Sequence, residues 1–175
     1  IVCTNTSTLL PSSFAEYTGC SERFCALHFA NEIWKHNTAE VMGHKGTDAS
    51  VFENVVKFAA EINMIPLKLY KEQPAYILNS LLVPLLDAGM KLWANGVADP
   101  ETIDLTWRLA VGAPRGPFQI LDIIGLETPY NISLHNPKSK EEGSIENLIL
   151  KKLKEKIDKG ETGINSGKGF YEYTK

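Results

Sequence analysis

Hydrophobic and polar positions follow different patterns in the two halves of the chain. In the first half, short apolar runs at 1–4, 24–29 and 39–42 are bounded by polar residues, and apolar residues alternate over 65–69. These run lengths and this period of two predict β-strands. Residues 49–63 predict a helix that Thr47 or Asp48 can cap, because apolar side chains recur there at helical spacing: Val51, Val55, Phe58, Ala59 and Ile62. Strands and a helix in this order predict an α/β layer.

In the second half, helical periodicity replaces the strand pattern. Residues 75–93 are apolar on nearly every side and predict a central buried helix. Asp99 and Pro100 predict the start of another helix, since an aspartate can cap it and a proline suits its first turn. Further helices are predicted at 118–124 and from Ser144 to about residue 160. The pattern therefore predicts two domains, 1–72 and 73–175, the first α/β and the second all-α.

Composition and charge argue against several classes of function. The 175 residues include 18 basic and 21 acidic side chains, for a net charge of −3. Nucleic-acid-binding proteins normally carry a basic surplus, so no nucleic-acid partner is expected. No membrane partner is expected either, because the most apolar stretch contains Asp87 and Lys91. Three cysteines without Cys-x-x-Cys spacing predict free thiols and a cytoplasmic protein.

The candidate chemistry centres on His28, which lies inside an apolar strand run, and on Glu40 beside the next run. A histidine and a carboxylate on neighbouring strands can form a general base with its orienting acid. The spacing alone, however, favours a structural histidine bonded to a backbone carbonyl. Ser7 follows the first strand, where open α/β sheets bind ligands, although it could equally cap the next turn. Asn79 is a polar residue in an apolar helix and suits substrate binding or packing equally.

The remaining polar residues indicate no further site. His36 and His44 lie near Glu40 but have no recognisable metal-ligand spacing, so no metal is predicted. The chain contains no Gly-x-Gly-x-x-Gly and no Walker loop. Phe170 and the tyrosines that follow it predict a C-terminal segment held in place by aromatic packing.

Several short motifs, taken together, resemble the 3-hydroxyacyl-CoA dehydrogenase family. Each is weak alone, but their order and the spacing of Ser7, His28 and Glu40 are specific, and the short bacterial 3-hydroxybutyryl-CoA dehydrogenase type is the form that the chain resembles. The motifs are Asn5-Thr6-Ser7-Thr8-Leu9, Leu27-His28-Phe29 with Asn31, Ala39-Glu40-Val41-Met42, Gln73-Pro74-Ala75-Tyr76-Ile77-Leu78-Asn79, Gly116-Pro117-Phe118 with Leu121-Asp122 and Ile124-Gly125-Leu126, and Ser166-Gly167-Lys168-Gly169-Phe170-Tyr171.

The resemblance implies NAD as cofactor, a 3-hydroxyacyl-CoA as substrate and a role for each candidate residue. His28 would take the proton from the 3-hydroxyl as hydride leaves C3, and Glu40 would hold the imidazole in the useful tautomer. Ser7 would hydrogen-bond the reacting oxygen near the cofactor, and Asn79 would hold substrate. Asn31 would lie near the nicotinamide.

The resemblance also implies limits on what these residues do alone. The family's NAD domain begins with a glycine-rich strand, turn and helix, so the chain is expected to be the α/β remnant of a Rossmann-type NAD-binding domain followed by the helical domain. The 175 residues by themselves are expected to be inactive and not to bind NAD measurably. A homodimer contact through the helical domain is expected, because residues 75–93 are apolar on more sides than a few short helices cover.

Departures from the family pattern keep alternatives open. Ala75 and Tyr76 stand where the family has Gly-Phe, and Ser80 replaces an arginine after Asn79. A related dehydrogenase or ketoreductase acting on a non-CoA 3-hydroxy or keto acid therefore stays possible. So does a non-catalytic helical dimerisation fragment in which His28 is structural, while metal-assisted hydrolysis is the most remote alternative.

Overall fold

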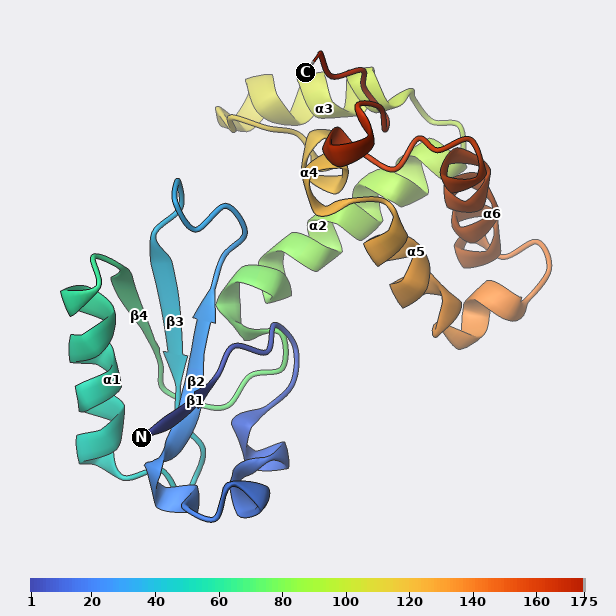
Figure 1. Ribbon diagram of the computed structural model, residues 1–175. Coiled ribbons are helices and arrows are strands. Elements are labelled where there is room, and N and C mark those ends of the chain that lie inside the picture. Colours follow the sequence, from blue (N-terminus) through green and yellow to red (C-terminus); the bar gives the residue numbers. More distant parts are fainter. Residues whose placement is uncertain (175) are drawn as a thin grey trace. The chain divides into compact units, whose positions relative to one another are not determined.

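The protein is described by a computed structural model that covers residues 1–174, and it forms two compact units. The first unit, Ile1–Leu82, contains a sheet and a long helix, and the second begins at Val83 and is all-helical (Figure 1). An α/β part followed by an all-α part confirms the predicted fold class. The strands and helix of the first unit are β1 (Val2–Thr4), β2 (Phe24–Phe29), β3 (Thr38–Met42), α1 (Ala49–Glu61) and β4 (Ile65–Leu69), with short 3₁₀ helices at Pro11–Ser13, Ala15–Thr18 and Ser21–Arg23.

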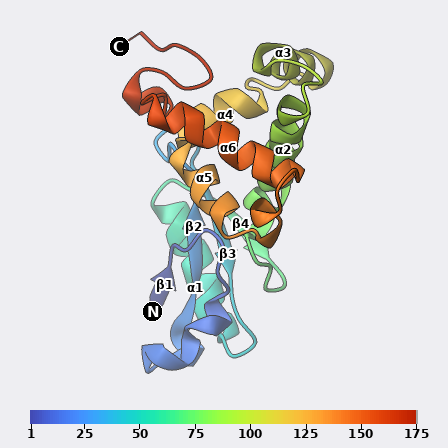
Figure 2. The same ribbon diagram turned by 90° about the vertical axis from the view of Figure 1, so that its right-hand side faces the viewer.

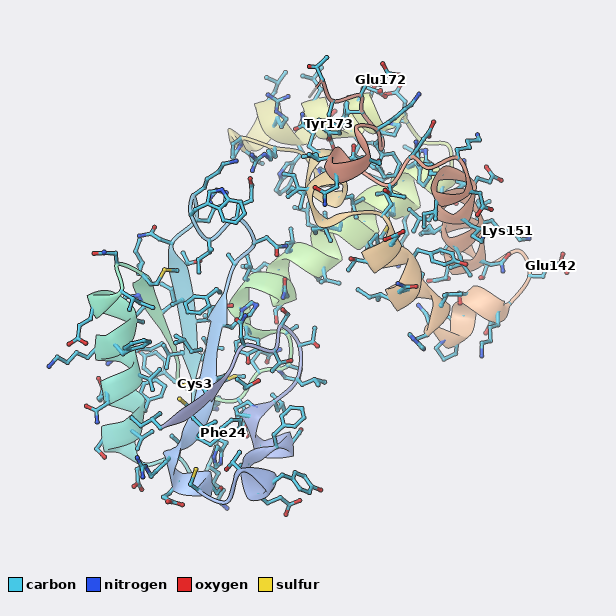
Figure 3. The ribbon with its side chains drawn as sticks, viewed as in Figure 1. Cys3, Phe24, Glu142, Lys151, Glu172 and Tyr173 are labelled. Atoms are coloured by element: carbon cyan, nitrogen blue, oxygen red, sulfur yellow. The ribbon has the colours of Figure 1, made fainter. Side chains whose placement is uncertain are left out.

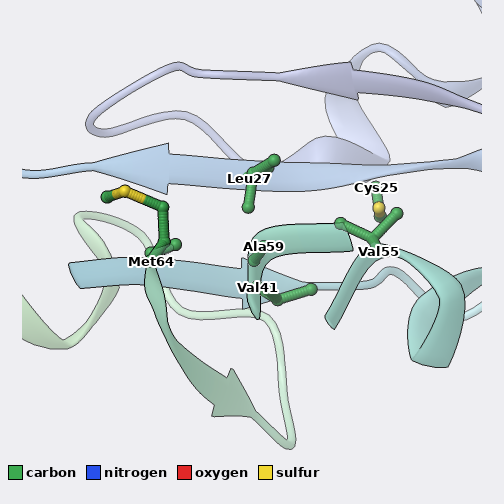
Figure 4. Close-up of a cluster of buried hydrophobic side chains, with 7 residues drawn as sticks. Cys25, Leu27, Val41, Val55, Ala59 and Met64 are labelled. Atoms are coloured by element: carbon green, nitrogen blue, oxygen red, sulfur yellow. The ribbon is translucent and has the colours of Figure 1, made fainter. Parts of the chain in front are cut away.

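The sheet of the first unit positions the candidate residues. Its order is β1-β2-β3-β4, with β1 parallel to β2, β2 antiparallel to β3, and β3 parallel to β4. The helix α1 connects β3 to β4 and covers one face, where Leu27 and Val41 pack against Val55 and Ala59 (Figure 4). Because side chains alternate along a strand, His28 and Glu40 belong to the opposite face.

The helix α1 has a narrower apolar stripe than the sequence predicts. Val51, Val55 and Ala59 are buried, whereas Phe58 is 50% exposed and Ile62 is 42% exposed. The buried residues recur every four positions, and Phe58 and Ile62 lie on one flank of that stripe, where they are partly exposed to solvent. The predicted side-chain cap is also wrong, because the Asp48 side chain makes no capping bond and Thr47 Oγ1 instead bonds the Phe24 carbonyl at 2.8 Å.

The second unit confirms three of the predicted helices and adds one. Asp99 Oδ1 accepts a bond from the Thr102 amide at 2.7 Å and Ser144 Oγ accepts one from the Asn147 amide at 3.0 Å, so both predicted caps are present. The added helix is α5, which starts without a side-chain cap and has no start signal in the sequence. Figure 2 shows α5 beside α6. The helices are α3 (Pro100–Val111), α4 (Pro117–Ile124), α5 (Glu127–Leu134) and α6 (Ile145–Asp158), with 3₁₀ helices at Pro137–Lys140 and Ile164–Ser166.

The helix α2 (Tyr76–Ala94) begins in the first unit and ends in the second. Within residues 1–174 it is the one helix whose length and hydropathy, a mean of 1.2, would allow it to cross a membrane. The expectation that this stretch is too polar to do so is therefore not met on composition. The prediction that this whole stretch is a buried central helix is wrong, because only 22% of it is buried and Leu81 is 71% exposed. Length and composition alone do not indicate a membrane protein, since helices of other proteins meet the same criterion.

The three cysteines are free thiols, as the sequence predicts. Cys3 and Cys25 are register partners on the parallel strands β1 and β2, and their sulfur atoms lie 3.7 Å apart. Figure 3 labels Cys3 on β1 and Phe24 at the start of β2. The hydrogen bond with Cys3, and then burial, raise the pKa of the Cys25 thiol, which therefore stays protonated.

Candidate active site

The pairing of β2 with β3 brings His28 and Glu40 together. The two residues are direct register partners across the antiparallel ladder, so their side chains leave the sheet on the same face. His28 Nδ1 lies 2.8 Å from Glu40 Oε2, and the side chains are only 4% and 3% exposed. The contact expected from the sequence is formed, and it is a buried side-chain pair. The structural alternative, a bond to a backbone carbonyl, does not describe Nδ1.

The second oxygen of Glu40 binds the first turn of α2. Oε1 accepts bonds from the amides of Ile77 at 2.9 Å and Leu78 at 3.0 Å, and these amides are among those that an α-helix leaves unpaired at its N-terminus. Three N–H groups thus converge on one carboxylate, which acts as an acceptor throughout. The imidazole then carries its proton on Nδ1, and Nε2 is the basic nitrogen. Nε2 has no hydrogen-bond partner within the described part of the chain, so it can accept a proton from substrate.

Tyr76 completes the surroundings of the imidazole. Its ring centroid lies 4.7 Å from that of His28 with a 33° angle between the planes, and the side chain is fully buried. Burial raises the pKa of Tyr76 to about 12, with further contributions from the negative charge of Glu40 and from Cys25. The phenol is therefore neutral beside the histidine near pH 7.

Ser7 and Asn79, both predicted as site residues, lie in contact. Asn79 Nδ2 donates to the Ser7 carbonyl at 3.1 Å, while the Ser7 hydroxyl has no hydrogen-bond partner among residues 1–174. Asn79 follows Tyr76 by three residues on α2, and residues three apart share one face of a helix. Tyr76 and Asn79 therefore both lie in the first turns of α2, whose backbone amides also bind Glu40. Ser7 is exposed, so its hydroxyl is accessible to a ligand.

Asn31, also predicted as a site residue, makes no hydrogen bond through its side chain to the other candidate site residues. Asn31 lies in the turn after β2, is exposed, and makes no side-chain hydrogen bond within the described residues. Sequence reasoning assigned no role to Asn5, whose Oδ1 accepts a bond from the Phe29 amide at 3.0 Å and so joins the ends of β1 and β2. The position of Asn5 directly after an apolar run is the one feature of the sequence that indicates a role for its side chain at the end of a strand.

The candidate cofactor-binding residues, Ser7 and Asn31, fit only one end of a dinucleotide such as NAD. The exposed hydroxyl of Ser7 and the exposed amide of Asn31 follow the carboxyl ends of the parallel strands β1 and β2, where such folds bind ligands. Hydroxyl and amide groups can donate to and accept from the carboxamide of a nicotinamide. The sequence holds no glycine-rich turn for the pyrophosphate, so these residues could hold the nicotinamide end alone.

The histidines weighed as metal ligands have other partners. His44 Nε2 bonds the Ser21 carbonyl at 2.9 Å, and His36 Nε2 lies 3.9 Å from Glu32 on the protein surface. Within the part of the chain that the structure covers, no three or more His, Cys, Asp or Glu side chains form a group able to hold a metal ion.

Comparison with known families gives a match over nearly the whole chain. The family model "3-hydroxyacyl-CoA dehydrogenase, NAD binding domain" matches residues 1–73, and "3-hydroxyacyl-CoA dehydrogenase, C-terminal domain" matches residues 76–173. The first match covers the strands that carry His28 and Glu40, and the second begins at Tyr76, whose ring contacts that of His28.

Individual relatives extend this result. The human mitochondrial hydroxyacyl-coenzyme A dehydrogenase is 32% identical over 99% of this chain, and a 3-hydroxybutyryl-CoA dehydrogenase of Clostridioides difficile is 28% identical over 100%. The chain spans 54% and 61% of these proteins, so it corresponds to little more than half of their length.

Solved structures show the same fold. A diketoreductase structure, described for dual catalysis of dicarbonyl compounds, is 54% identical with a TM-score of 0.90 and covers 99% of this chain and 59% of its own. An (S)-3-hydroxybutyryl-CoA dehydrogenase from Ralstonia eutropha is 26% identical with a TM-score of 0.79, over 100% of this chain and 61% of its own.

Proposed function

Because the chain belongs to the 3-hydroxyacyl-CoA dehydrogenase family, we propose that it supplies the acid–base residues of an NAD-dependent oxidoreductase acting on a 3-hydroxy or 3-keto group. The observation that supports the proposal is the buried bond between His28 Nδ1 and Glu40, which leaves Nε2 as the base. If His28 were purely structural, its second ring nitrogen, Nε2, would be expected to bond another protein group, and it does not do so in the described part of the chain.

The proposed reaction follows from that geometry. In the oxidative direction His28 Nε2 accepts the proton of the 3-hydroxyl, and in the reductive direction it returns that proton to the keto oxygen. Glu40 keeps the ring proton on Nδ1 and stabilises the imidazolium that forms. Ser7 hydrogen-bonds the reacting oxygen, Asn79 holds the substrate, and Asn31 lies toward the nicotinamide. Bound NAD supplies the hydride acceptor or donor.

Two classes of substrate are candidates. A 3-hydroxyacyl-CoA is the first, because the curated relatives are named for such substrates. A dicarbonyl compound without CoA is the second, and the 54% identity to a diketoreductase favours it. Ser80, which replaces the family's arginine beside Asn79, lies next to a proposed substrate-binding residue and is consistent with a different substrate.

The substrate question can be tested with a matched pair of 3-oxo compounds. Acetoacetyl-CoA and ethyl acetoacetate share the reacting keto group and differ in the CoA moiety. The polypeptide assayed joins this chain to a glycine-rich NAD-binding segment, and NADH oxidation is followed for both compounds. Turnover of the thioester alone supports the first candidate, and turnover of the ester supports the second. Absence of turnover with both would refute the proposed function, and the 175 residues alone are the inactive control.

The acid–base role can be tested with a pair of histidine variants. His28→Gln keeps a polar side chain of similar size but removes the base, so kcat should fall by roughly 10³-fold. His36→Gln is the matched control, because His36 lies on the surface of the same unit and should leave kcat unchanged. Equal activity of both variants would contradict the assignment.

We also propose a homodimer contact through the helical unit. The helix α3 exposes Leu105 by 52% and Leu109 by 76%, and these residues, one turn apart, form an apolar surface that a second copy could bury. Sedimentation velocity over a wide range of concentration tests this directly. A dimer that Leu109→Glu dissociates would support the proposal, and a monomer at every concentration would rule it out.

A further inference from the structure

Tyr76 is a large buried residue whose hydroxyl oxygen makes no hydrogen bond within the described part of the fold. It is fully buried against Ala26, Met42 and Leu69 on the face of the sheet that carries His28. Among residues 1–174 its Oη is the one fully buried side-chain polar atom without a hydrogen-bond partner. The contacts of Tyr76 are therefore made by its ring, and the ring lies 4.7 Å from the imidazole of His28.

The backbone holds Tyr76 in an unusual conformation. Ala75 and Tyr76 have φ angles of 65° and 55°. Residues other than glycine rarely adopt these backbone angles, which persist only where the surrounding structure enforces them. The hydroxyl of Ser80 bonds the Tyr76 carbonyl, and it also bonds the Pro74 carbonyl at 3.3 Å. On the other side, the amides that follow Tyr76 are held by Glu40. The position of the ring is thus fixed from both ends.

The bond to Glu40 alone does not fix the orientation of the imidazole. One hydrogen bond at Nδ1 sets the distance and the tautomer but does not by itself fix the plane of the imidazole, because coupled changes in the two side-chain torsions of His28 can keep the bond while the plane tilts. A flat aromatic surface at stacking distance removes that freedom. Such a tilt would change the direction of the Nε2 lone pair, and misplacement of a reacting group by about 1 Å can cost on the order of 10²-fold in rate.

We propose that Tyr76 is a positioning residue for His28, with its ring face holding the imidazole plane so that Nε2 keeps its direction toward substrate. This inference rests on the proposed base role of His28 and deepens it. The ring is what acts, and the hydroxyl is not required. A substitution that removes only the hydroxyl and one that removes the ring should therefore have different effects on kcat.

Two variants test the ring against the hydroxyl. All kcat values here refer to the polypeptide that joins this chain to the glycine-rich NAD-binding segment, which is the parent protein. Tyr76→Phe keeps the ring, so kcat should stay within about twofold of that parent. Tyr76→Leu keeps an apolar side chain but removes the aromatic face, so kcat should fall by about 10²-fold with little change in KM. Leu69→Ala is the matched control, because Leu69 lies in the same buried cluster and its loss creates a cavity without removing the aromatic face. It should lower stability and leave kcat unchanged.

Nuclear magnetic resonance of His28 gives a readout independent of turnover. The imidazole protons of His28 should show an upfield ring-current shift in the parent protein and in Tyr76→Phe, and the ¹⁵N shifts should report a proton fixed on Nδ1. In Tyr76→Leu the ring-current shift should disappear and the nitrogen shifts should move toward a mixture of tautomers, while Leu69→Ala stays like the parent.

The outcomes distinguish this inference from the proposed function. If Tyr76→Leu matches Tyr76→Phe in kcat and in the imidazole spectrum, Tyr76 does not position His28 and the inference fails. If the parent protein turns over no 3-oxo substrate but the imidazole signals change as expected, the proposed function fails while the positioning of His28 by Tyr76 stands.

Discussion

The two units of the chain use the same construction around buried carboxylates, with different partners. In the first unit Glu40 receives two amides of α2 and the imidazole of His28. In the second, Asp104 receives the amides of Phe118 and Gln119 at 2.8 and 2.9 Å, together with the hydroxyl of Tyr171 at 2.9 Å. Each carboxylate thus gathers two backbone amides at the start of a helix and one side chain.

A third carboxylate extends the comparison. Asp122 receives the amides of Phe170 and Tyr171 and the hydroxyl of Tyr173, so it ties the C-terminal segment to α4; Figure 3 labels Tyr173 there. Burial, and then the bonds to these carboxylates, raise the pKa values of Tyr171 and Tyr173, so neither exchanges a proton near neutral pH. The difference lies in the third partner: a tyrosine makes the carboxylate structural, and an imidazole makes it part of an acid–base pair.

The sharpest test of this difference is Glu40→Gln. The amide group cannot accept from His28 Nδ1 and from the α2 amides at once, so the tautomer and the helix start are both disturbed. We expect kcat to fall by roughly 10³-fold and the free energy of unfolding to fall by about 3 kcal/mol. Assays in the NAD-binding polypeptide and urea unfolding measure the two effects. A variant that unfolds more easily but retains kcat would show that Glu40 is only structural.

In the second unit the largest loss of stability is expected from Gly169→Ala. A Cβ atom at residue 169 would lie 2.1 Å from Asp122 Oδ1, and Asp122 cannot move without breaking three hydrogen bonds. We expect a loss of about 3 kcal/mol or more in the free energy of unfolding, measured by urea titration. Gly143→Ala is the comparison for adding a methyl group without a clash: no atom lies within 4 Å of its Cβ position, and its cost is limited to the left-handed φ of 83°, about 1 kcal/mol. Equal stability of both variants would contradict the close packing at Asp122.

The sequence predicts the local parts of this arrangement and not the contacts between distant segments. His28 and Glu40 each lie in an apolar run of their own, which predicts two strands, and the antiparallel register of these strands places both side chains on one face. The caps at Asp99 and Ser144 were found because capping involves residues three apart. Asp104 and Asp122 show no such signal, since their partners lie 14 to 67 residues away.

The same limitation explains the residues that were misjudged. Tyr76 reads as one more apolar position of a helix, because nothing local shows that two consecutive left-handed residues turn it onto His28. Phe58 and Ile62 fit the helical pattern, but the width of the buried stripe depends on the sheet beneath α1. The helix α5 has weak amphipathicity and no side-chain cap, so neither signal identified it.

A smaller loss, confined to stability, is expected from Asp122→Asn. The new amide group keeps one acceptor oxygen for the Phe170 amide but places N–H donors against the Tyr171 amide and the Tyr173 hydroxyl. We expect the free energy of unfolding to fall by about 2 kcal/mol, with kcat per folded molecule unchanged. A fall in kcat comparable to that of Glu40→Gln would contradict the division between structural and acid–base carboxylates.

Alkaline pH should destabilise the first unit through Tyr76. Its folded pKa of about 12 lies above the ordinary value of 10, so the folded state holds the phenolic proton more tightly than the unfolded state. The stabilising effect is complete below pH 10 and is lost as the pH rises from 10 through 12. Urea unfolding at a series of alkaline pH values should therefore show a steep decline, and Tyr76→Phe should flatten it. An identical decline in both proteins would exclude Tyr76 as its source.

The smallest expected effect is a gain in stability from Tyr76→Phe at neutral pH. A buried hydroxyl without a partner has given up its hydrogen bonds to water, and this loss costs about 1 kcal/mol or more. Phenylalanine keeps the contacts with Ala26, Met42 and Leu69 and removes that cost, so the free energy of unfolding should rise by about 1 kcal/mol. Tyr173→Phe is the control in the second unit, where the hydroxyl bonds Asp122 at 2.9 Å and its loss should lower stability. Opposite signs for the two substitutions would show that the same hydroxyl group is satisfied in the structural unit and left unsatisfied beside His28. A loss of stability in Tyr76→Phe would mean that the hydroxyl has a partner in solution.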